Sequence, residues 1–183
     1  MGSQGIVHGT YLTLLNASRQ YLGTSDMSGK VFVTAGLGGM SGAQPKAGMI
    51  SGCVSVVAEV DENALMKRHN QGWVKEVTKS VEETIRRMKE ARTNKEVTSI
   101  GFHGNVVALW EALAEEEELI VELGSDQTSL HDPYGGGYYP VQLTFEQAKE
   151  MIAVDPDIFK NLVQESLRSQ VTAINKLCGK GMK

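Results

Sequence analysis

The stretch from Val31 to Gln44, VFVTAGLGGMSGAQ, restricts the fold more than any other part of the sequence. The apolar run Val31 to Thr34 is typical of a strand that is buried on both faces, as in parallel sheets. Four glycines then fall within the seven positions 36–42, and helix-forming residues follow them. So much bare backbone between a buried strand and a helix favours a loop that a phosphate group can approach closely. The alternative is that the glycines only form a tight turn.

Apolar runs alternate with helical patterns along the rest of the chain. Besides Val31 to Thr34, the predicted strands are 53–58, 97–102 and 119–123. The predicted helices are 5–22, 43–50, 106–114 and a long surface helix with apolar positions from Val74 to Met88. Two more helices are predicted near the end of the chain, one capped by Thr144 and Gln147 and one that starts at Asp155. This alternation predicts an α/β fold, a Rossmann-like parallel sheet with flanking helices, a variant glycine loop and helical segments at both chain ends.

Length and composition narrow the class of protein. A chain of 183 residues is the size of one domain, and its net charge of −4 argues against nucleic acid or an anionic membrane as the main partner. No apolar run of about 18 residues and no signal segment is present, which favours the cytoplasm. Cys53 and Cys178 have neither the spacing of a zinc site nor the neighbours of a reactive thiol, so we expect no metal ligand and no nucleophile from them.

Residues suited to a ligand follow every predicted strand. Ligands of open parallel sheets bind at the carboxyl ends of the strands, where this chain places the glycine loop, Glu59, His103-Gly104-Asn105 and Asp126 to Ser129. Glu59 follows Gly36 by 23 residues, close to the ~20-residue offset at which an acid accepts hydrogen bonds from an adenosine ribose. These features predict a phosphate-bearing ligand, with NAD as the preferred candidate. The fingerprint G-x-G-x-x-G is a variant, because Ser41 takes the third glycine position and Gly42 falls one place late.

The histidines have two interpretations each. His131 lies beside Asp132 in a polar loop, and His103 lies at a strand end, so both are candidates for a functional role or for hydrogen bonds to loop backbone. His8 and His69 lie in helical sequence and are expected to be structural. The acidic run 115–118 is interpreted as a solvated helix end.

With these residues assembled, the chain resembles the urocanase (urocanate hydratase) family over nearly its whole length. The resemblance rests on five strings: SQGIVHGTY at 3–11, TAGLGGMSGAQPKAG at 34–48, HGN at 103–105, DQTSLHDP at 126–133 and GGYYP at 136–140. A GLGGM loop followed at this separation by a DQTS-H-DP loop is specific to that family.

The resemblance implies a lyase of histidine degradation that converts urocanate and water to imidazolonepropionate, with tightly bound NAD⁺ as an electrophile. It also implies where NAD⁺ is contacted. These residues are Gly39, Met40 and Ser41 at the pyrophosphate, Glu59 at the adenosine ribose, Asn105 and Val106 after the third predicted strand, Gln127, Thr128, Ser129, Leu130 and His131 in the next loop, and Tyr138 and Tyr139 beside it. Many family members have an arginine five residues after the ribose acid, where this chain has Ala64, with Arg68 one helical turn later.

The resemblance further implies a domain organisation. Family members are several hundred residues long, and their NAD-binding domain is inserted in a core domain that supplies the substrate pocket. We therefore expect residues 1–183 to be one NAD-binding domain taken from a longer protein, with 1–25 and 155–183 as helical connections to the core. No catalytic residue is assigned to this chain, which alone is expected to be inactive. Urocanate is a partner only of the longer protein, which in this family tends to form a homodimer.

Two other functions are compatible with the residues. One is an NAD-dependent dehydrogenase domain, which the serine at position 41 disfavours. The other is a binding or assembly module in which the glycine loop is purely structural and the apolar faces of the terminal helices are the working surface.

Overall fold

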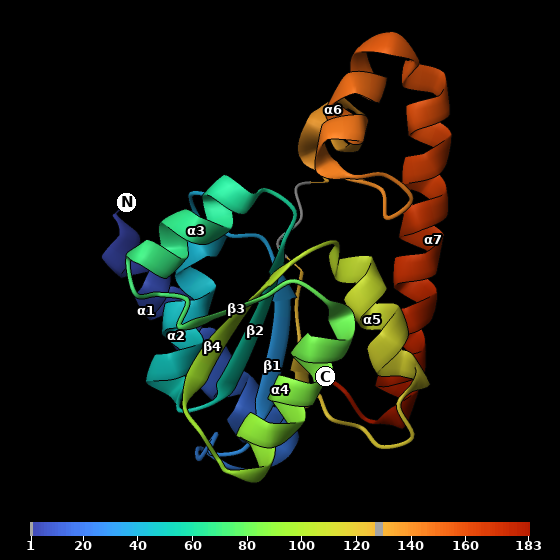
Figure 1. Ribbon diagram of the computed structural model, residues 1–183. Helices are drawn as coiled ribbons and strands as arrows, with labels where there is room; N and C mark the ends of the chain where they lie inside the picture. Colours follow the sequence, from blue (N-terminus) through green and yellow to red (C-terminus); the bar gives the residue numbers. More distant parts are fainter. Residues whose placement is uncertain (1, 127–129) are drawn as a thin grey trace.

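The apolar runs form the strands of one parallel sheet that is covered by helices on both faces (Figure 1). The computed structural model describes residues 2–126 and 130–183. The strands are β1 (Val31–Ala35), β2 (Val54–Glu59), β3 (Glu76–Thr78), β4 (Thr98–His103) and β5 (Leu123–Gly124). They lie in the order β3-β4-β2-β1-β5, and each neighbouring pair is parallel. The predicted Rossmann-like α/β fold is confirmed.

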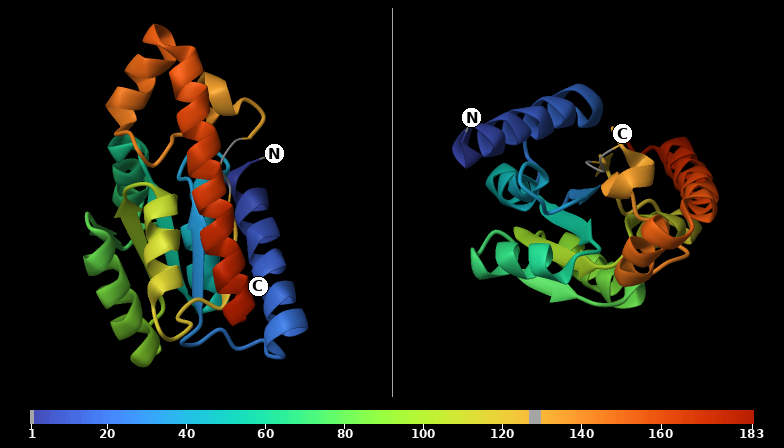
Figure 2. Two further views of the ribbon diagram at one scale, coloured as in Figure 1. Left: turned by 90° about the vertical axis from the view of Figure 1, so that its right-hand side faces the viewer. Right: turned by 90° about the horizontal axis from the view of Figure 1, so that it is seen from above.

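Two layers of helices enclose the sheet. The helices are α1 (Ser3–Ala17), α2 (Gln44–Ser51), α3 (Glu62–Asn70), α4 (Val81–Thr93), α5 (Val106–Glu115), α6 (Phe145–Val154) and α7 (Pro156–Lys180). Alternate residues of a strand point to opposite faces, so Val31 and Val33 pack in the larger core with α4, α5 and α7, whereas Phe32 packs with Leu14 of α1. In Figure 2, α1 and α2 accordingly lie on the opposite side of the sheet from α5 and α7.

The prediction of one long helix from Val74 to Met88 is wrong. Residues Glu76–Thr78 form β3, an edge strand paired only with β4, and α4 begins at Val81 with Ser80 as its N-cap. The apolar residues Val74, Val77 and Val81 happen to repeat at helical spacing. A three-residue strand is too short to interrupt that pattern in the sequence.

The prediction of a strand at 119–123 is also largely wrong, because β5 contains only Leu123–Gly124. In this segment the buried carboxylate of Glu122 accepts a hydrogen bond from the N–H of Val31 at 2.8 Å and one from Arg92 Nη2 at 2.7 Å. The backbone N–H of Glu122 also donates to the carbonyl of Val31 at 3.1 Å, and the backbone of Glu122 and Gly124 is hydrogen-bonded to Lys183.

The terminal helices agree with their sequence signals. The helix predicted at 5–22 is α1 continued by a π-helical turn, Ser18–Leu22, and Gly23 ends it at φ +68°. Thr144 and Gln147 form the capping box of α6, and Asp155 caps α7 through the N–H of Ile158. The helix α6 and the first turns of α7 extend beyond the carboxyl edge of the sheet (Figures 1 and 2).

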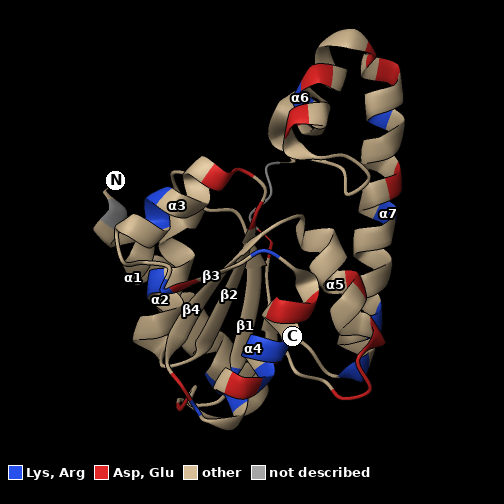
Figure 3. Ribbon diagram, viewed as in Figure 1, with Lys and Arg blue, Asp and Glu red and all other residues tan. Residues whose placement is uncertain are grey.

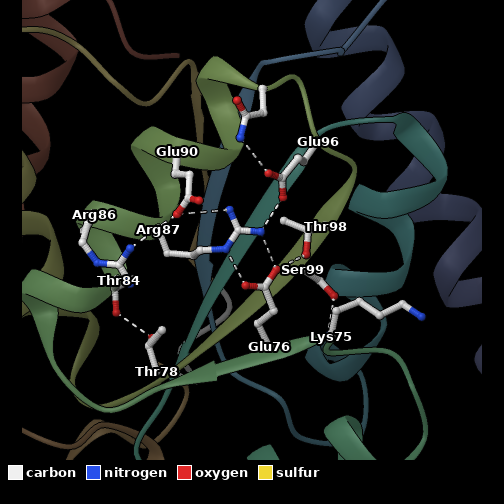
Figure 4. A network of polar contacts seen from close by, with 11 residues as sticks. Lys75, Glu76, Thr78, Thr84, Arg86, Arg87, Glu90, Glu96, Thr98 and Ser99 are labelled. Atoms are coloured by element: carbon white, nitrogen blue, oxygen red, sulfur yellow. Dashed lines mark hydrogen bonds and ion pairs between the residues drawn. The ribbon is translucent and has the colours of Figure 1, made fainter.

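Charged residues are rare in the sheet (Figure 3). Of the strand residues that the structure describes, only Glu59 and Glu76 are Asp, Glu, Lys or Arg. Glu76 belongs to an ion-pair network in which Arg87 Nε donates to Glu76 Oε2 at 2.6 Å and Arg87 Nη2 donates to Glu96 (Figure 4). These hydrogen bonds raise the pKa of Arg87 and lower the pKa of Glu96. Glu76 is therefore a structural ion pair, and Glu59 is the strand carboxylate left for another role.

Three further findings concern the expectations about thiols, metals and membranes. Cys53 is fully buried, and burial raises the pKa of its thiol to about 12, which is unsuited to a nucleophile. No group of three or more potential metal ligands occurs within residues 2–126 and 130–183. None of the helices in those ranges is both long and apolar enough to cross a bilayer.

Candidate functional site

The ends of β1, β2 and β4 meet around one cleft of about 200 Å³ at the carboxyl edge of the sheet. Its walls come from the glycine loop, the end of β2, the start of α5 and the loop before α6. The lining residues are Ala35, Gly36, Gly38, Ser41, Ala58, Glu59, Val60, Gly104, Asn105, Val106, Gly137, Tyr138 and Tyr139. Segments far apart in the sequence are thus brought together where open parallel sheets bind ligands.

The glycine loop leaves β1 through a backbone conformation that needs glycine. Gly36 has φ +91°, and its N–H donates to the carbonyl of Ala58 at 2.8 Å, so the loop crosses directly onto β2. Leu37 is then buried in a cluster with Val57, Leu65 and Val74. This anchor leaves Gly38, Gly39 and Met40 exposed, and Gly38 lines the cleft.

The exposed part of the loop presents hydrogen-bond donors. Within the described part of the chain, the backbone N–H groups of Gly39 and Met40 have no protein acceptor. A 3₁₀ turn, Ser41–Ala43, follows them and leads directly into α2. N–H groups at a helix start carry partial positive charge and favour an anion, so the loop is suited to a phosphate.

Glu59 connects the cleft to the loop. Its Oε2 accepts from the N–H of Leu37 at 2.6 Å, and its Oε1 accepts from the N–H of Asp61 at 3.0 Å. No lysine or arginine among the described residues pairs with it. Each carboxylate oxygen retains capacity for one more donor, such as a sugar hydroxyl.

Asn105 closes the far side of the cleft through its side chain. Its Oδ1 accepts from the N–H of Val107 and caps α5, and its Nδ2 donates to the carbonyl of Tyr139 at 2.7 Å. Because both ends of this amide are used, Asn105 holds the loop at 138–139 against α5. Val106 is buried and begins α5, so it offers the cleft its backbone and its apolar surface.

The two tyrosines differ in orientation. Tyr138 is 2% exposed, and its hydroxyl lies against Ser166 Oγ at 2.8 Å and donates to Gln170 Oε1 at 3.0 Å, so the hydroxyl points into α7. Tyr139 is half-buried and packs on Phe145 with ring centroids 4.8 Å apart. Burial, with the carboxylates of Asp61 and Glu59, raises the pKa of Tyr139. Only Tyr139 is placed to offer a hydroxyl to a ligand.

We expect the substitution Tyr138→Phe to destabilise the fold without weakening ligand binding. It removes the hydrogen bonds that the hydroxyl makes with the buried side chains of Ser166 and Gln170, which costs about 1–2 kcal/mol. Burial raises the pKa of Tyr138 from 10.0 to about 12, so its contribution is complete below pH 10 and is lost as the pH rises toward 12. Urea unfolding at pH 8 and pH 11 should show a smaller difference between the two proteins at pH 11. Weaker NAD⁺ binding by the variant would contradict this placement.

The structure describes only some of the predicted site residues in the DQTSLH loop. Gln127, Thr128 and Ser129 lie outside the described residues. Leu130 and His131 are exposed, and neither lines the cleft. Their roles stay predictions. His103 lines a neighbouring cavity of about 460 Å³, between the starts of α3 and α6, which shares Asn105 with the cleft.

Sequence reasoning missed a buried polar cluster beneath the loop. Gln44 Oε1 accepts from Thr34 Oγ1 at 2.8 Å, and Gln44 Nε2 donates to the carbonyl of Ala35 at 3.2 Å. Ser125 Oγ donates to Thr34 Oγ1 at 2.8 Å. This cluster ties the end of β1 to the start of α2 and to the segment after β5. The signal was available in the polar residues Thr34 and Gln44 inside an otherwise apolar stretch.

Arg68 does not line the cleft. It is 8% exposed and lies behind the glycine loop, where its guanidinium contacts loop carbonyls. Position 64, where many family members have an arginine, is an alanine in this chain. The buried position of Arg68 does not support a direct contact of its side chain with an adenosine in place of that arginine.

Comparison with known proteins identifies the family. A family model described as the urocanase Rossmann-like domain matches residues 2–183. The chain is 63% identical to urocanate hydratase of Homo sapiens over 181 residues, which is 97% of this chain and 27% of that protein. It is 61% identical to urocanate hydratase of Mus musculus over 97% of this chain and 27% of that protein. It is 59% identical to a probable urocanate hydratase of Caenorhabditis elegans over 100% of this chain and 27% of that protein.

These matches extend over the glycine loop, Glu59, Asn105 and both tyrosines of the cleft. The chain spans only about a quarter of the length of these relatives. On the family model and the three relatives together, the chain belongs to the urocanase family, of which it contains the Rossmann-like domain.

Proposed function

We propose that the cleft binds the ADP-ribose part of NAD⁺. The observation that carries the proposal is the convergence of three strand ends at one cleft. Within residues 2–126 and 130–183, the adjoining loop has N–H donors without a protein acceptor, and the carboxylate of Glu59 has no cationic partner. This is the donor and acceptor set that a pyrophosphate and a ribose require.

The residues fit the cofactor as follows. The N–H groups of Gly39 and Met40, with Ser41 at the start of the 3₁₀ turn, would receive the pyrophosphate, and Glu59 would accept hydrogen bonds from the adenosine ribose. The backbone at Asn105 and Val106, with Tyr139, would bound the other side. Gln127 to His131 remain proposed contacts from the loop beyond Asp126.

We further propose that the domain, residues 1–183, belongs to a longer cytoplasmic urocanate hydratase that adds water to urocanate and yields imidazolonepropionate in histidine degradation. The names of the relatives support this assignment. NAD⁺, when bound, would act as an electrophile toward the substrate. The residues of this chain would bind and orient the cofactor, whereas substrate binding, catalysis and dimerisation would involve the rest of the protein, reached through 1–25 and 155–183.

The proposal is tested by two measurements on the purified 183-residue chain. The chain is denatured and its supernatant is analysed by mass spectrometry for NAD⁺, and dialysed protein is titrated with NAD⁺ by calorimetry. We expect about one NAD⁺ per chain in one experiment or saturable binding in the other, without turnover of urocanate. Absence of both retained and added NAD⁺ would reject the cofactor site, and clear turnover of urocanate would reject the division of labour between the domains.

A second candidate, an assembly module, is favoured by one feature. An apolar cavity of about 550 Å³ lies between α1 and α2 and is lined by residues that include Tyr11, Ile50 and Trp73. Light scattering distinguishes the two functions, because an assembly module would self-associate without any affinity for NAD⁺.

A further inference from the structure

Arg68 is a buried cation whose described partners are all neutral. It lies in the last turn of α3, with 8% of its surface exposed. Its Nε donates to the carbonyl of Leu37 at 3.1 Å, its Nη2 donates to the carbonyl of Gly38, and its Nη1 donates to Gln71 Oε1 at 3.0 Å. The guanidinium also lies over the ring of Trp73, with its Cζ 5.2 Å from the ring centroid. Buried charges are normally paired, so a cation without a carboxylate in the described chain indicates an anion nearby.

The two carbonyl contacts fix the direction of the next two N–H groups. In a planar trans peptide, the C=O of one residue and the N–H of the following residue point in opposite directions. Because the guanidinium holds the carbonyls of Leu37 and Gly38, the N–H groups of Gly38 and Gly39 point away from Arg68. Gly38 lines the cleft, and Gly39, the next residue, is exposed.

We infer that Arg68 is a positioning residue, which orients the N–H groups of Gly38 and Gly39 toward the pyrophosphate and places a positive charge behind them. The inference rests on the proposed NAD⁺ site. The planar guanidinium presents its donors at fixed spacing and holds both carbonyls and Gln71 at once, whereas a lysine ammonium is a compact point charge without this fixed fork.

Gly42 supports the same role. A Cβ at this position would overlap the Arg68 guanidinium, so a glycine is required for the arginine to lie behind the loop. This accounts for the displaced glycine of the fingerprint. Serine is accommodated at position 41 because the 3₁₀ turn comes closest to the Arg68 side chain one residue later, at Gly42.

The test compares Arg68→Met with a matched variant, Arg87→Met. Arg87 is also a partly buried guanidinium on a helix, hydrogen-bonded to the carboxylates of Glu76 and Glu96, but it lies beside the amino end of β4 (Figure 4). Each protein is titrated with NAD⁺, ADP-ribose and adenosine, followed by NMR, and its unfolding temperature is measured. For Arg68→Met we expect affinity for NAD⁺ and ADP-ribose to fall roughly 10- to 100-fold, with little change for adenosine. Arg68→Lys should restore only part of the loss, and Arg87→Met should lower the unfolding temperature without changing any affinity.

The outcomes separate the two proposals. If wild-type protein binds neither NAD⁺ nor ADP-ribose, the proposed function fails and the role of Arg68 fails with it. If wild-type protein binds both and Arg68→Met binds them equally well, only the role of Arg68 is overturned. Equal losses for adenosine and ADP-ribose would also overturn it, because they would indicate general loosening of the site instead of loss of a pyrophosphate-binding surface.

Discussion

The substitution Glu59→Gln is expected to weaken NAD⁺ binding roughly 10- to 100-fold. The two carboxylate oxygens of Glu59 accept from the N–H groups of Leu37 and Asp61, at 2.6 Å and 3.0 Å. Glutamine has one acceptor oxygen, so its NH₂ group would face one of these donors and displace the glycine loop. The substitution also removes the negative charge that is proposed to accept the ribose hydroxyls. Calorimetric titration with NAD⁺ measures the loss.

Glu122→Gln is the matched control for Glu59→Gln. Glu122 is another buried carboxylate that accepts from a strand N–H, that of Val31 at 2.8 Å, but it lies at the opposite end of β1. This variant should lose stability, since Arg92 is left without its carboxylate partner, and should bind NAD⁺ as tightly as wild-type protein. The account is wrong if the two variants lose affinity equally, or if Glu59→Gln loses none.

The substitution Gly48→Val is expected to destabilise the fold by about 3 kcal/mol, at the upper end of the usual range for overpacking. Gly48 lies where α2 crosses β2, and a Cβ added there would lie 2.6 Å from Ser55 Cβ and 2.7 Å from Ser55 Oγ. The Cβ of Ser55 cannot move away without a shift of the β2 backbone, because this part of the strand is buried. The close helix–strand packing that the third fingerprint glycine usually permits is thus provided by Gly48.

Gly9→Val provides the comparison, because it makes the same chemical change in α1. A Cβ at Gly9 would meet no atom within 4 Å, so the effect should stay within about 0.5 kcal/mol. Urea denaturation of both variants measures the difference. Similar stability of the two variants would show that α2 does not pack on β2 as closely as described.

Local sequence patterns were sufficient for the elements whose burial repeats regularly. The runs that became β1, β2 and β4 are buried along almost their whole length because helices cover both of their faces. The glycine loop and Glu59 were predictable because strand order brings their ends together, and both line one cleft in the structure.

The features that could not be predicted depend on contacts between distant residues. The edge strand β3 exists because of its pairing with β4, and the segment before β5 is held to Val31 by both the side chain and the backbone of Glu122. Likewise, Tyr138 and Tyr139 are adjacent in the sequence, but only the packing of α7 determines that the hydroxyl of Tyr138 points away from the cleft. The position of Arg68 behind the loop depends on its contact with the carbonyl of Gly38, thirty residues earlier in the sequence.

The most direct test of the account is an NMR titration of ¹⁵N-labelled chain with NAD⁺. The amide signals of Gly38, Gly39, Glu59, Asn105 and Val106 are predicted to shift together and to saturate with a single affinity. Signals of the apolar cavity between α1 and α2, such as those of Ile50 and Trp73, should stay in place. Shifts confined to that cavity, or no shifts at millimolar NAD⁺, would contradict a cofactor site at the carboxyl edge of the sheet.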